Sequence, residues 1–236
     1  MTNRLMLCSI CARGGSKGVV GKNARMMAGR PLIAYSIAQA LETGLFAHIA
    51  VSSDDPAILE AAERSGADIL VRRPDELASD VAPKAAAIRH CAEQAEVQVK
   101  KQFDIFVDLD ATAPLRLPED IRGAVALMVE SGADNVITGA PARRSPYFNL
   151  VERRPDGTVG LSKPSAVSRR QDSPACFDMN ASIYVWNRAS MAAGPKVFSD
   201  NTRLYEMPHE RSLDIDSELD WDFVEFLMLR SDRSPR

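Results

Sequence analysis

A basic, glycine-rich segment over residues 12–23 has the composition of a phosphate-binding loop. Its sequence is Ala-Arg-Gly-Gly-Ser-Lys-Gly-Val-Val-Gly-Lys-Asn. The four glycines let the backbone curl and turn N–H groups toward an anion, while Arg13, Lys17 and Lys22 supply positive charge. The P-loop and dinucleotide patterns both fail, because Ser16 and Arg13 stand where G-x-x-x-x-G-K-[ST] and G-x-G-x-x-G need glycine. The segment therefore predicts a polyphosphate site of another class. The alternative interpretation is a flexible loop with solvated cations.

A second chemical pattern is the acidic block Ser-Leu-Asp-Ile-Asp-Ser-Glu-Leu-Asp at residues 212–220. Side chains of an extended segment repeat every two residues, so Asp214 and Asp216 point to the same side. Mg²⁺ is commonly held by a few carboxylates together with phosphate oxygens and water. We therefore predict that these two aspartates bind Mg²⁺. The alternative is that the block only complements the dipole of the following helix, which accounts for Glu218 and Asp220 better than for Asp214.

Short apolar runs alternate with helical stretches along the chain, which is typical of a parallel sheet with crossover helices. We expect strands at 5–11, 48–52, 68–71, 105–109, 135–138 and 181–186. We expect helices at 31–44, 54–66, 83–97, 118–131 and 218–230, the last of them amphipathic. The glycine-rich segment follows the first strand, and open α/β sheets bind ligands at the carboxyl ends of their strands. The phosphate site is therefore expected at that edge.

The pattern changes after Gly139. Residues 147–152 and 158–161 have the character of two hairpin strands, joined by a turn that contains Pro-Asp-Gly. No internal repeat, low-complexity tract or linker interrupts the chain. The sequence thus predicts one α/β domain over residues 1–236 with an inserted antiparallel arm at 140–175.

Charge and composition exclude several classes of protein. The chain has 236 residues, of which 45% are hydrophobic and 26% charged, as is usual for a globular domain. A formal net charge of -3 gives no reason to expect binding to nucleic acid or acidic membranes. No apolar run approaches the roughly 20 residues that cross a bilayer, and no secretory signal pattern is visible. We expect a cytoplasmic protein that binds neither nucleic acid nor membrane.

Cysteine and histidine offer little further chemistry. Cys8 and Cys11 have C-x-x-C spacing, but residues three apart on a strand point to opposite faces, and no second pair completes a zinc site. We interpret the cysteines as buried thiols of a cytoplasmic protein, where the compartment is reducing. His48, His90 and His209 fall at a strand start, within a helix and in a turn, so none is an obvious general base.

The glycine-rich segment resembles the signature loop of the CMP-sialic acid synthetases, also called acylneuraminate cytidylyltransferases. The resemblance implies a Rossmann-like α/β domain of the nucleotide-diphospho-sugar transferase type, with CTP as the nucleotide. The residues that would embrace CTP are Arg13, Gly14, Gly15, Ser16, Lys22 and Asn23. Arg13 and Lys22 would act on the phosphates as catalytic residues. Asn23, which both donates and accepts hydrogen bonds, would reach the base.

Two further blocks resemble the same family in the same order. Residues 73–80, Arg-Pro-Asp-Glu-Leu-Ala-Ser-Asp, are similar to a segment beside the nucleoside, which implies that Arg73 contacts base or ribose. An ordinary helix-capping loop is the alternative. Lys84 occupies a place where some relatives carry a ribose-binding serine.

Residues 109–116, Leu-Asp-Ala-Thr-Ala-Pro-Leu-Arg, resemble a block in which a glutamine faces the sugar. Asp110 stands at that glutamine, which implies a somewhat different sugar. It could instead approach the metal or only hold the next loop.

Residues 170–172 and 178–184 resemble the sugar-binding wall of the same family. A nonulosonic acid carries a carboxylate at its anomeric carbon, and arginine holds a carboxylate through two parallel hydrogen bonds. The sugar-binding residues implied are Asp110, Arg170, Asn180 and Tyr184. Surface charge is the alternative for the arginine. These blocks are closer to the legionaminic-acid branch than to the neuraminic-acid enzymes.

Together the blocks predict an enzyme that transfers CMP from CTP to the anomeric hydroxyl of a nonulosonic acid and releases pyrophosphate. Asp214 and Asp216 match the family's S-I-D-I-D-x-x-x-D pattern and would hold Mg²⁺ against the triphosphate, with Asp216 as a catalytic residue. The resemblance also implies a homodimer in which the arm reaches the partner's sugar site. The alternatives are a cytidylyltransferase for another acidic sugar, such as an octulosonate, and a catalytically silent nucleotide-binding module.

Overall fold

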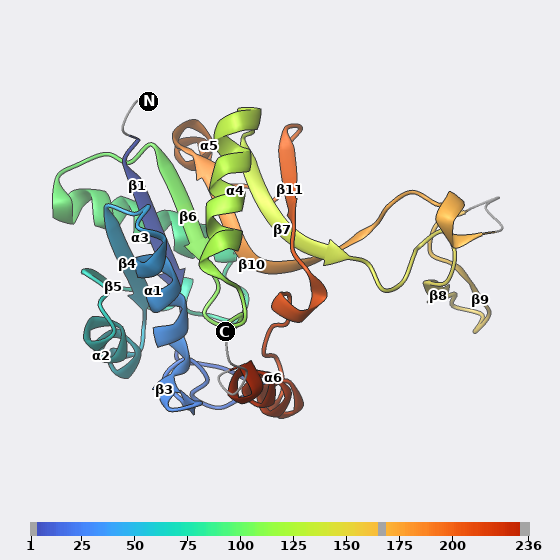
Figure 1. The fold of residues 1–236 in the computed structure, drawn as a ribbon, viewed down its shortest axis with the longest axis horizontal. Coiled ribbons are helices and arrows are strands. Elements are labelled where there is room, and N and C mark those ends of the chain that lie inside the picture. The colour runs from blue at the N-terminus through green and yellow to red at the C-terminus, as the bar shows by residue number, and fades with distance from the viewer. Residues whose placement is uncertain (1–3, 165–168, 232–236) are drawn as a thin grey trace.

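A seven-stranded sheet, ordered β11-β7-β10-β6-β1-β4-β5, forms the centre of the protein (Figure 1). The computed structural model describes residues 4–164 and 169–231. The strands of this sheet are β1 Met6–Cys11, β4 His48–Ser53, β5 Ile69–Arg72, β6 Ile105–Leu109, β7 Asn135–Pro141, β10 Phe177–Asn187 and β11 Thr202–Glu206. Neighbouring strands run parallel except at β10, which is antiparallel to both β6 and β7. The predicted mainly parallel α/β fold is confirmed.

Helices cover both faces of the sheet. Their bounds are α1 Leu32–Thr43, α2 Pro56–Arg64, α3 Lys84–Val99, α4 Pro118–Ser131, α5 Arg188–Ala193 and α6 Glu218–Ser231. Ile37, Ile58 and Ile121 place α1, α2 and α4 in one apolar cluster, whereas Ile88 and Met191 place α3 and α5 in another. Within the described residues, no helix combines the length and the apolar character needed to cross a membrane.

Local signals account for several element boundaries. Helix α2 begins at Pro56, and the carboxylate of its N-cap Asp55 accepts a hydrogen bond from the Ala57 amide at 2.8 Å. Helices α1 and α4 end immediately before Gly44 and Gly132, as predicted. Strand β11 and helix α5 were not predicted. The sequence of β11, Thr-Arg-Leu-Tyr-Glu, suits an edge strand but lacks a strong apolar pattern.

A small apolar cluster beside the sheet joins two segments that lie far apart in the sequence. We call residues 12–23 the glycine loop and residues 212–220 the acidic segment. Val19 of the glycine loop, Ile215 of the acidic segment and Trp221 of α6 are all buried in this cluster. The short hairpin of β2 Met26–Met27 and β3 Arg30–Pro31 then leads from the glycine loop to α1. Burial of these side chains holds the glycine loop against the acidic segment.

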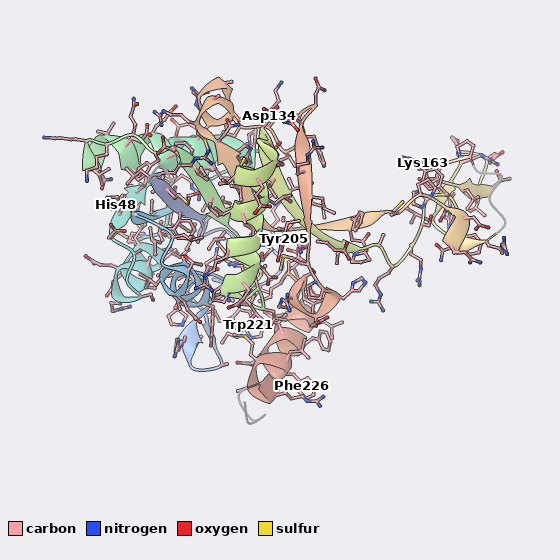
Figure 2. The ribbon with its side chains drawn as sticks, turned by 45° about the horizontal axis from the view of Figure 1, so that its top comes forward. His48, Asp134, Lys163, Tyr205, Trp221 and Phe226 are labelled. Carbon is pink, nitrogen blue, oxygen red and sulfur yellow. The ribbon has the colours of Figure 1, made fainter. Side chains whose placement is uncertain are left out.

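Helix α6 carries apolar side chains on two sides. Trp221 faces the body of the protein, whereas Phe226 points away from it (Figure 2). Leu219, Phe223 and Phe226 are 77%, 51% and 52% exposed. The prediction of an amphipathic helix was therefore wrong for the outer side, where apolar residues stand in place of polar ones.

Residues 142–164 and 169–176, which we call the arm, lie between β7 and β10 in the sequence and extend away from the body (Figure 1). The arm carries the hairpin of β8 Val151–Arg153 and β9 Val159–Leu161, which is a sheet of its own. In Figure 2, the labelled Lys163 lies on the arm, well away from the body. A short 3-10 helix at Arg170–Asp172 also lies on the arm.

Candidate active site

A cavity of about 530 Å³ opens at the carboxyl ends of β1, β5 and β6, where α/β sheets bind ligands. The predicted site residues that line it are Arg13, Ser16, Lys22, Asn23, Arg73, Asp110 and Asp216. These side chains come from four separate parts of the chain. The fold thus brings the glycine loop, the nucleoside block, the end of β6 and the acidic segment to one place.

The glycine loop and the acidic segment are in direct contact. A Cβ atom added at Gly18 would lie 1.8 Å from the main-chain oxygen of Asp216, so only glycine permits this approach. The ammonium of Lys22 donates to the Ile215 carbonyl and lies 3.7 Å from Asp216 Oδ1. One cation of the loop, Lys22, therefore lies beside a carboxylate of the acidic segment, that of Asp216.

Asp214 and Asp216 differ in their surroundings. The side chain of Asp216 is 79% exposed and lines the cavity, whereas Asp214 is not among the lining residues. Burial, and then the negative charge of Asp216, raise the pKa of Asp214. No group of three or more acidic, histidine or cysteine side chains suited to a metal occurs in the described part of the chain. Two adjacent carboxylates still fit a hard divalent cation whose other ligands are phosphate oxygens and water.

Two cations of the glycine loop are engaged with an acid that the sequence had not singled out. Arg13 Nη1 lies 2.7 Å from Asp80 Oδ1, and Lys17 Nζ lies 2.5 Å from Asp80 Oδ2. The hydrogen bond from Lys17 is the main reason that the pKa of Asp80 is lowered. The carboxylate of Asp80 therefore occupies the position predicted for a phosphate group. A phosphate group would therefore compete with Asp80 for the same two cations.

Gly14 and Asn23 of the glycine loop make hydrogen bonds within the protein that the sequence did not predict. The Gly14 amide donates to Asp54 Oδ1 at 3.0 Å, so this N–H is not free for an anion. Gly15 has open space around its Cα. Asn23 is buried and donates to the Arg13 carbonyl at 3.0 Å, while its Oδ1 lacks a hydrogen-bond partner among the described residues. That unpaired acceptor is suited to an amino group such as the one on cytosine.

Arg73 is held at the end of β4. Its guanidinium donates to the Ser52 carbonyl at 2.8 Å and to Ser52 Oγ at 3.2 Å. The residue is 5% exposed and still lines the cavity. Its orientation is therefore fixed before any ligand binds.

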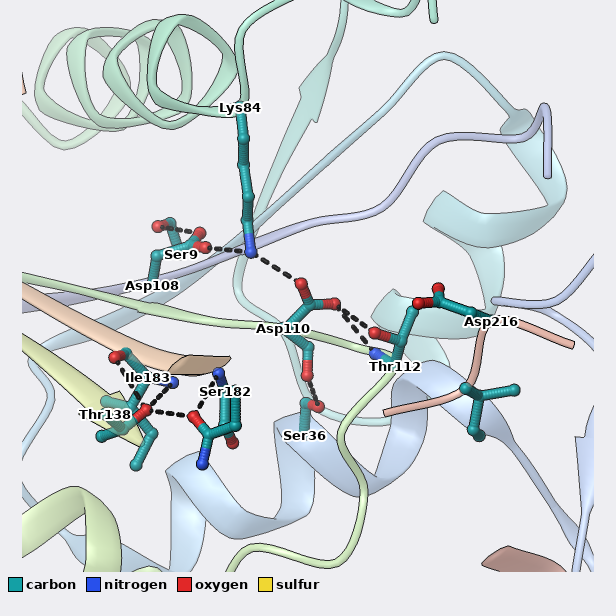
Figure 3. Close-up of polar contacts among 12 residues, drawn as sticks. Ser9, Ser36, Lys84, Asp108, Asp110, Thr112, Thr138, Ser182, Ile183 and Asp216 are labelled. Carbon is teal, nitrogen blue, oxygen red and sulfur yellow. Dashed lines mark hydrogen bonds and ion pairs between the residues drawn. The ribbon is translucent and has the colours of Figure 1, made fainter. Parts of the chain in front are cut away.

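A group of charged side chains forms the wall of the cavity beyond β6 (Figure 3). Lys84 Nζ lies 2.7 Å from Asp110 Oδ2 and 3.4 Å from Asp108 Oδ2. The sequence pointed to Asp110 but not to Asp108. A charged residue inside the apolar strand Ile-Phe-Val-Asp-Leu was the signal available for it.

The predicted sugar-binding residues outside Asp110 do not line the cavity in the described structure. Asn180 accepts from Thr138 Oγ1 at 2.6 Å and donates to Ser212 Oγ at 2.9 Å, so its amide ties β10 to the acidic segment. Tyr184 is buried and stacks on Trp186. Arg170 lies on the arm, and its side chain is outside the described part of the structure.

Comparison with known proteins defines the class. Residues 7–212 match the cytidylyltransferase family, so the chain belongs to this family and is a nucleotidyltransferase. Enzymes of this kind generally use a divalent metal ion. The predicted membership of the CMP-sialic acid synthetase family is confirmed by the relatives described next.

The chain is 46% identical to the "Post-translational flagellin modification protein B" of Campylobacter coli, with 94% of both chains covered. It is 44% identical to the CMP-N,N'-diacetyllegionaminic acid synthase of Campylobacter jejuni subsp. jejuni serotype O:2, with 98% of both chains covered. Among solved structures, a CMP:2-keto-3-deoxy-manno-octonic acid synthetase complexed with CTP superposes with a TM-score of 0.70 over 96% of this chain and 99% of that one. At 18% identity, this last similarity shows the fold alone.

Proposed function

We propose that this protein transfers CMP from CTP to the anomeric hydroxyl of a nonulosonic acid and releases pyrophosphate. The observation that carries the proposal is the contact of the glycine loop with the acidic segment at Gly18 and Asp216. A catalytically silent nucleotide-binding module would need the cations but has no use for a carboxylate pressed against them. The relatives named above support the same reaction.

The glycine loop would hold the triphosphate. Arg13 and Lys22 line the cavity and supply positive charge to the phosphates, with Lys17 beside them. Asn23 and Arg73 would receive the cytosine and ribose at the other end of the same cavity. Phosphoryl transfer needs little covalent work from a protein, so positioning and charge neutralisation supply most of the rate enhancement.

Asp214 and Asp216 would hold the divalent cation, which we propose to be Mg²⁺. Their carboxylate oxygens fit a hard cation, and the exposure of Asp216 toward the cavity leaves room for phosphate ligands. When bound, such an ion supplies Lewis-acid stabilisation of the charge that develops on the phosphates. None of the described cavity residues is a histidine.

The sugar would enter beside Asp110 and Thr112. Arg170 is the predicted partner of the sugar carboxylate, but it lies on an arm that extends away from the body of its own chain (Figure 1). We therefore propose a homodimer in which each arm, with Arg170, completes the sugar site of its partner. Asn180 and Tyr184 would not contact the sugar but would support the residues that line the sugar site.

Among nonulosonic acids we favour one of the legionaminic type. A relative with 44% identity over nearly the whole chain is a CMP-N,N'-diacetyllegionaminic acid synthase. The octulosonate alternative has only the shared fold in its favour. We also propose a cytoplasmic location, since all four cysteines are free thiols, as a reducing compartment requires.

Pyrophosphate release with CTP, Mg²⁺ and a panel of nonulosonic acids tests the proposal. We expect turnover with a legionaminic acid, weaker turnover with neuraminic acid, and none with an octulosonate. Asp216→Ala should lower kcat by about a thousandfold or more, because it removes a ligand that acts on the transition state. Its fold should persist, since this side chain is mostly exposed. A near-normal rate in the folded variant would contradict the metal role.

A further inference from the structure

Lys84 reaches from the first turn of α3 into the wall of the cavity, where Figure 3 shows it between Asp108 and Asp110. Its ammonium lies between Asp110 at 2.7 Å and Asp108 at 3.4 Å. The ring of Tyr184 lies on a further side, 5.0 Å from the ammonium. The lysine therefore has little freedom to swing into the cavity as an independent ligand.

Asp110 is fixed in direction as firmly as Lys84. Its Oδ1 accepts from the Thr112 amide at 3.0 Å and from Thr112 Oγ1 at 2.9 Å, while Oδ2 accepts from Lys84. Its main-chain carbonyl accepts from the buried guanidinium of Arg116. The carboxylate still lines the cavity, with 22% of the side chain exposed. It is an acceptor with a set orientation at the surface of the site.

Asp108 adds a second negative charge behind this wall. It is fully buried, and its Oδ1 accepts from Ser9 Oγ at 2.8 Å. Its Oδ2 lacks a hydrogen-bond partner in the described structure and faces Lys84. Two carboxylates thus share one ammonium. Without Lys84, the charge of Asp110 would repel the carboxylate of the sugar in the proposed reaction.

The position of Asp110 indicates a contact with the sugar rather than with the base. The carbonyl of Thr112 accepts from the Ile215 amide at 3.0 Å, which places this turn next to the acidic segment. The attacking sugar must meet the triphosphate there, whereas Asn23 and Arg73 serve the nucleoside. An ionised carboxylate accepts hydrogen bonds only, so it selects an O–H or N–H group.

We propose that Lys84 is a positioning residue that fixes Asp110 as a charged acceptor for a donor group of the sugar. In the same position Lys84 offsets the negative charge that would otherwise repel the acidic sugar. The inference rests on the proposed function and names how this site selects its sugar. A hydroxyl or acylamino N–H of the nonulosonic acid is the group recognised.

Steady-state kinetics with CTP and the nonulosonic acid varied separately test this role. The variants are D110N, K84M, K84R and K84M/D110N, with K101M as the control at an exposed lysine outside the cavity. D110N and K84M should each raise the KM for the sugar about tenfold or more, because a site built around a hydrogen bond discriminates strongly when that bond is lost. The KM for CTP should stay within about twofold. K84R should recover part of the sugar affinity.

The double variant separates a positioning role from two independent contacts. If Lys84 acts through Asp110, K84M/D110N should be no worse than K84M, since the two effects are not additive. Three results would overturn the inference. The losses of sugar affinity could multiply in the double variant, the KM for the sugar could stay unchanged in D110N, or the KM values for CTP and sugar could rise equally. If K84M fails to fold, K84M/D108N removes the stranded carboxylate and takes its place, with the same expected loss of sugar affinity.

The wild-type protein distinguishes this inference from the proposed function. A wild type that releases no pyrophosphate with CTP and any nonulosonic acid would overturn both. An active wild type with K84M indistinguishable from K101M would overturn only the role of Lys84.

Discussion

Charged side chains in and beside the cavity are arranged as ion pairs. These pairs are Arg13–Asp80, Lys17–Asp80, Lys22–Asp216, Lys84–Asp108 and Lys84–Asp110. Most of them are partly exposed, so they add little to the free energy of unfolding. Their main effect is on orientation, because each ion pair fixes the direction of its cation. At Arg13 and Lys17, substrate phosphates would then replace the carboxylate of Asp80 rather than order free side chains.

The pair of Lys84 with Asp108 predicts a pH-dependent stability. Burial raises the pKa of Asp108, and the charge of Lys84 opposes that rise. The titratable groups around Asp108 are Cys8, Cys11, Lys84, Asp110, Arg116 and Tyr184. In K84M the pKa of Asp108 should rise further. The folded state would then hold its proton over a range in which the unfolded chain has lost it.

A folded state that binds more protons than the unfolded state loses stability as the pH rises. K84M should therefore lose more of its free energy of unfolding between about pH 5 and about pH 8 than the wild type does. Urea unfolding of wild type and K84M at both pH values measures this. K84M/D108N should lack the extra pH dependence. Parallel curves for wild type and K84M would contradict the predicted coupling.

Between elements, the decisive contact is that of the glycine loop with the acidic segment. The main chain of Asp216 occupies the space that a side chain at position 18 would need. Gly18→Ala should therefore separate the two segments. We expect a loss of about 1–3 kcal/mol in stability, as overpacking usually costs, and a fall in kcat/KM of about a hundredfold.

Thermal unfolding and pyrophosphate release of the Gly18→Ala variant measure these two effects. Gly15→Ala is the matched control for stability, because its added methyl group would meet no atom within 4 Å. If Gly18→Ala were as stable and as active as wild type, the close approach of the two segments would be needed for neither stability nor activity.

Elements and single contacts differ in how far the sequence predicts them. Helix α2 was predictable because its signal, Asp-Pro at the N-terminus, is local. Asn180 illustrates the opposite case, since its partners Thr138 and Ser212 lie 42 and 32 residues away and only the folded sheet brings them together. The ion pair of Lys84 with Asp108 is hidden for the same reason. Strand β11 was missed because edge strands need no continuous apolar pattern.

For the whole molecule, the arm is the feature that a single chain leaves unexplained. Val151, Val159 and Leu161 of its hairpin are 55%, 59% and 40% exposed. Exposed apolar residues on an extended segment are typical of a surface that another chain covers. Burial of the arm against a partner would complete both sugar sites in a two-fold symmetric dimer.

Mixing two inactive variants tests the shared site. Arg170→Ala removes the predicted sugar contact from the arm, and Asp216→Ala removes the predicted metal ligand from the cavity. A heterodimer of the two would contain one site with both defects and one intact site. After subunit exchange, the equimolar mixture should recover about a quarter of wild-type activity, since random pairing in a two-fold dimer makes half of the dimers mixed.

The control is the activity of each variant alone, measured after the same treatment. A mixture no more active than the sum of its components, with exchange verified by mass spectrometry, would show that Arg170 serves the cavity of its own chain or none at all.

The contact between Gly18 and Asp216 spans most of the sequence, and this has a consequence for biosynthesis. A ribosome completes the strands of the sheet before it adds Ile215 and Trp221, which seat the acidic segment against the glycine loop. The catalytic centre is therefore assembled last, after the scaffold that carries it. A translation product that stops after β11 but before Asp214 would keep the sheet and the cationic loop yet lack both aspartates. Such a fragment would still attract nucleotides without being able to use them.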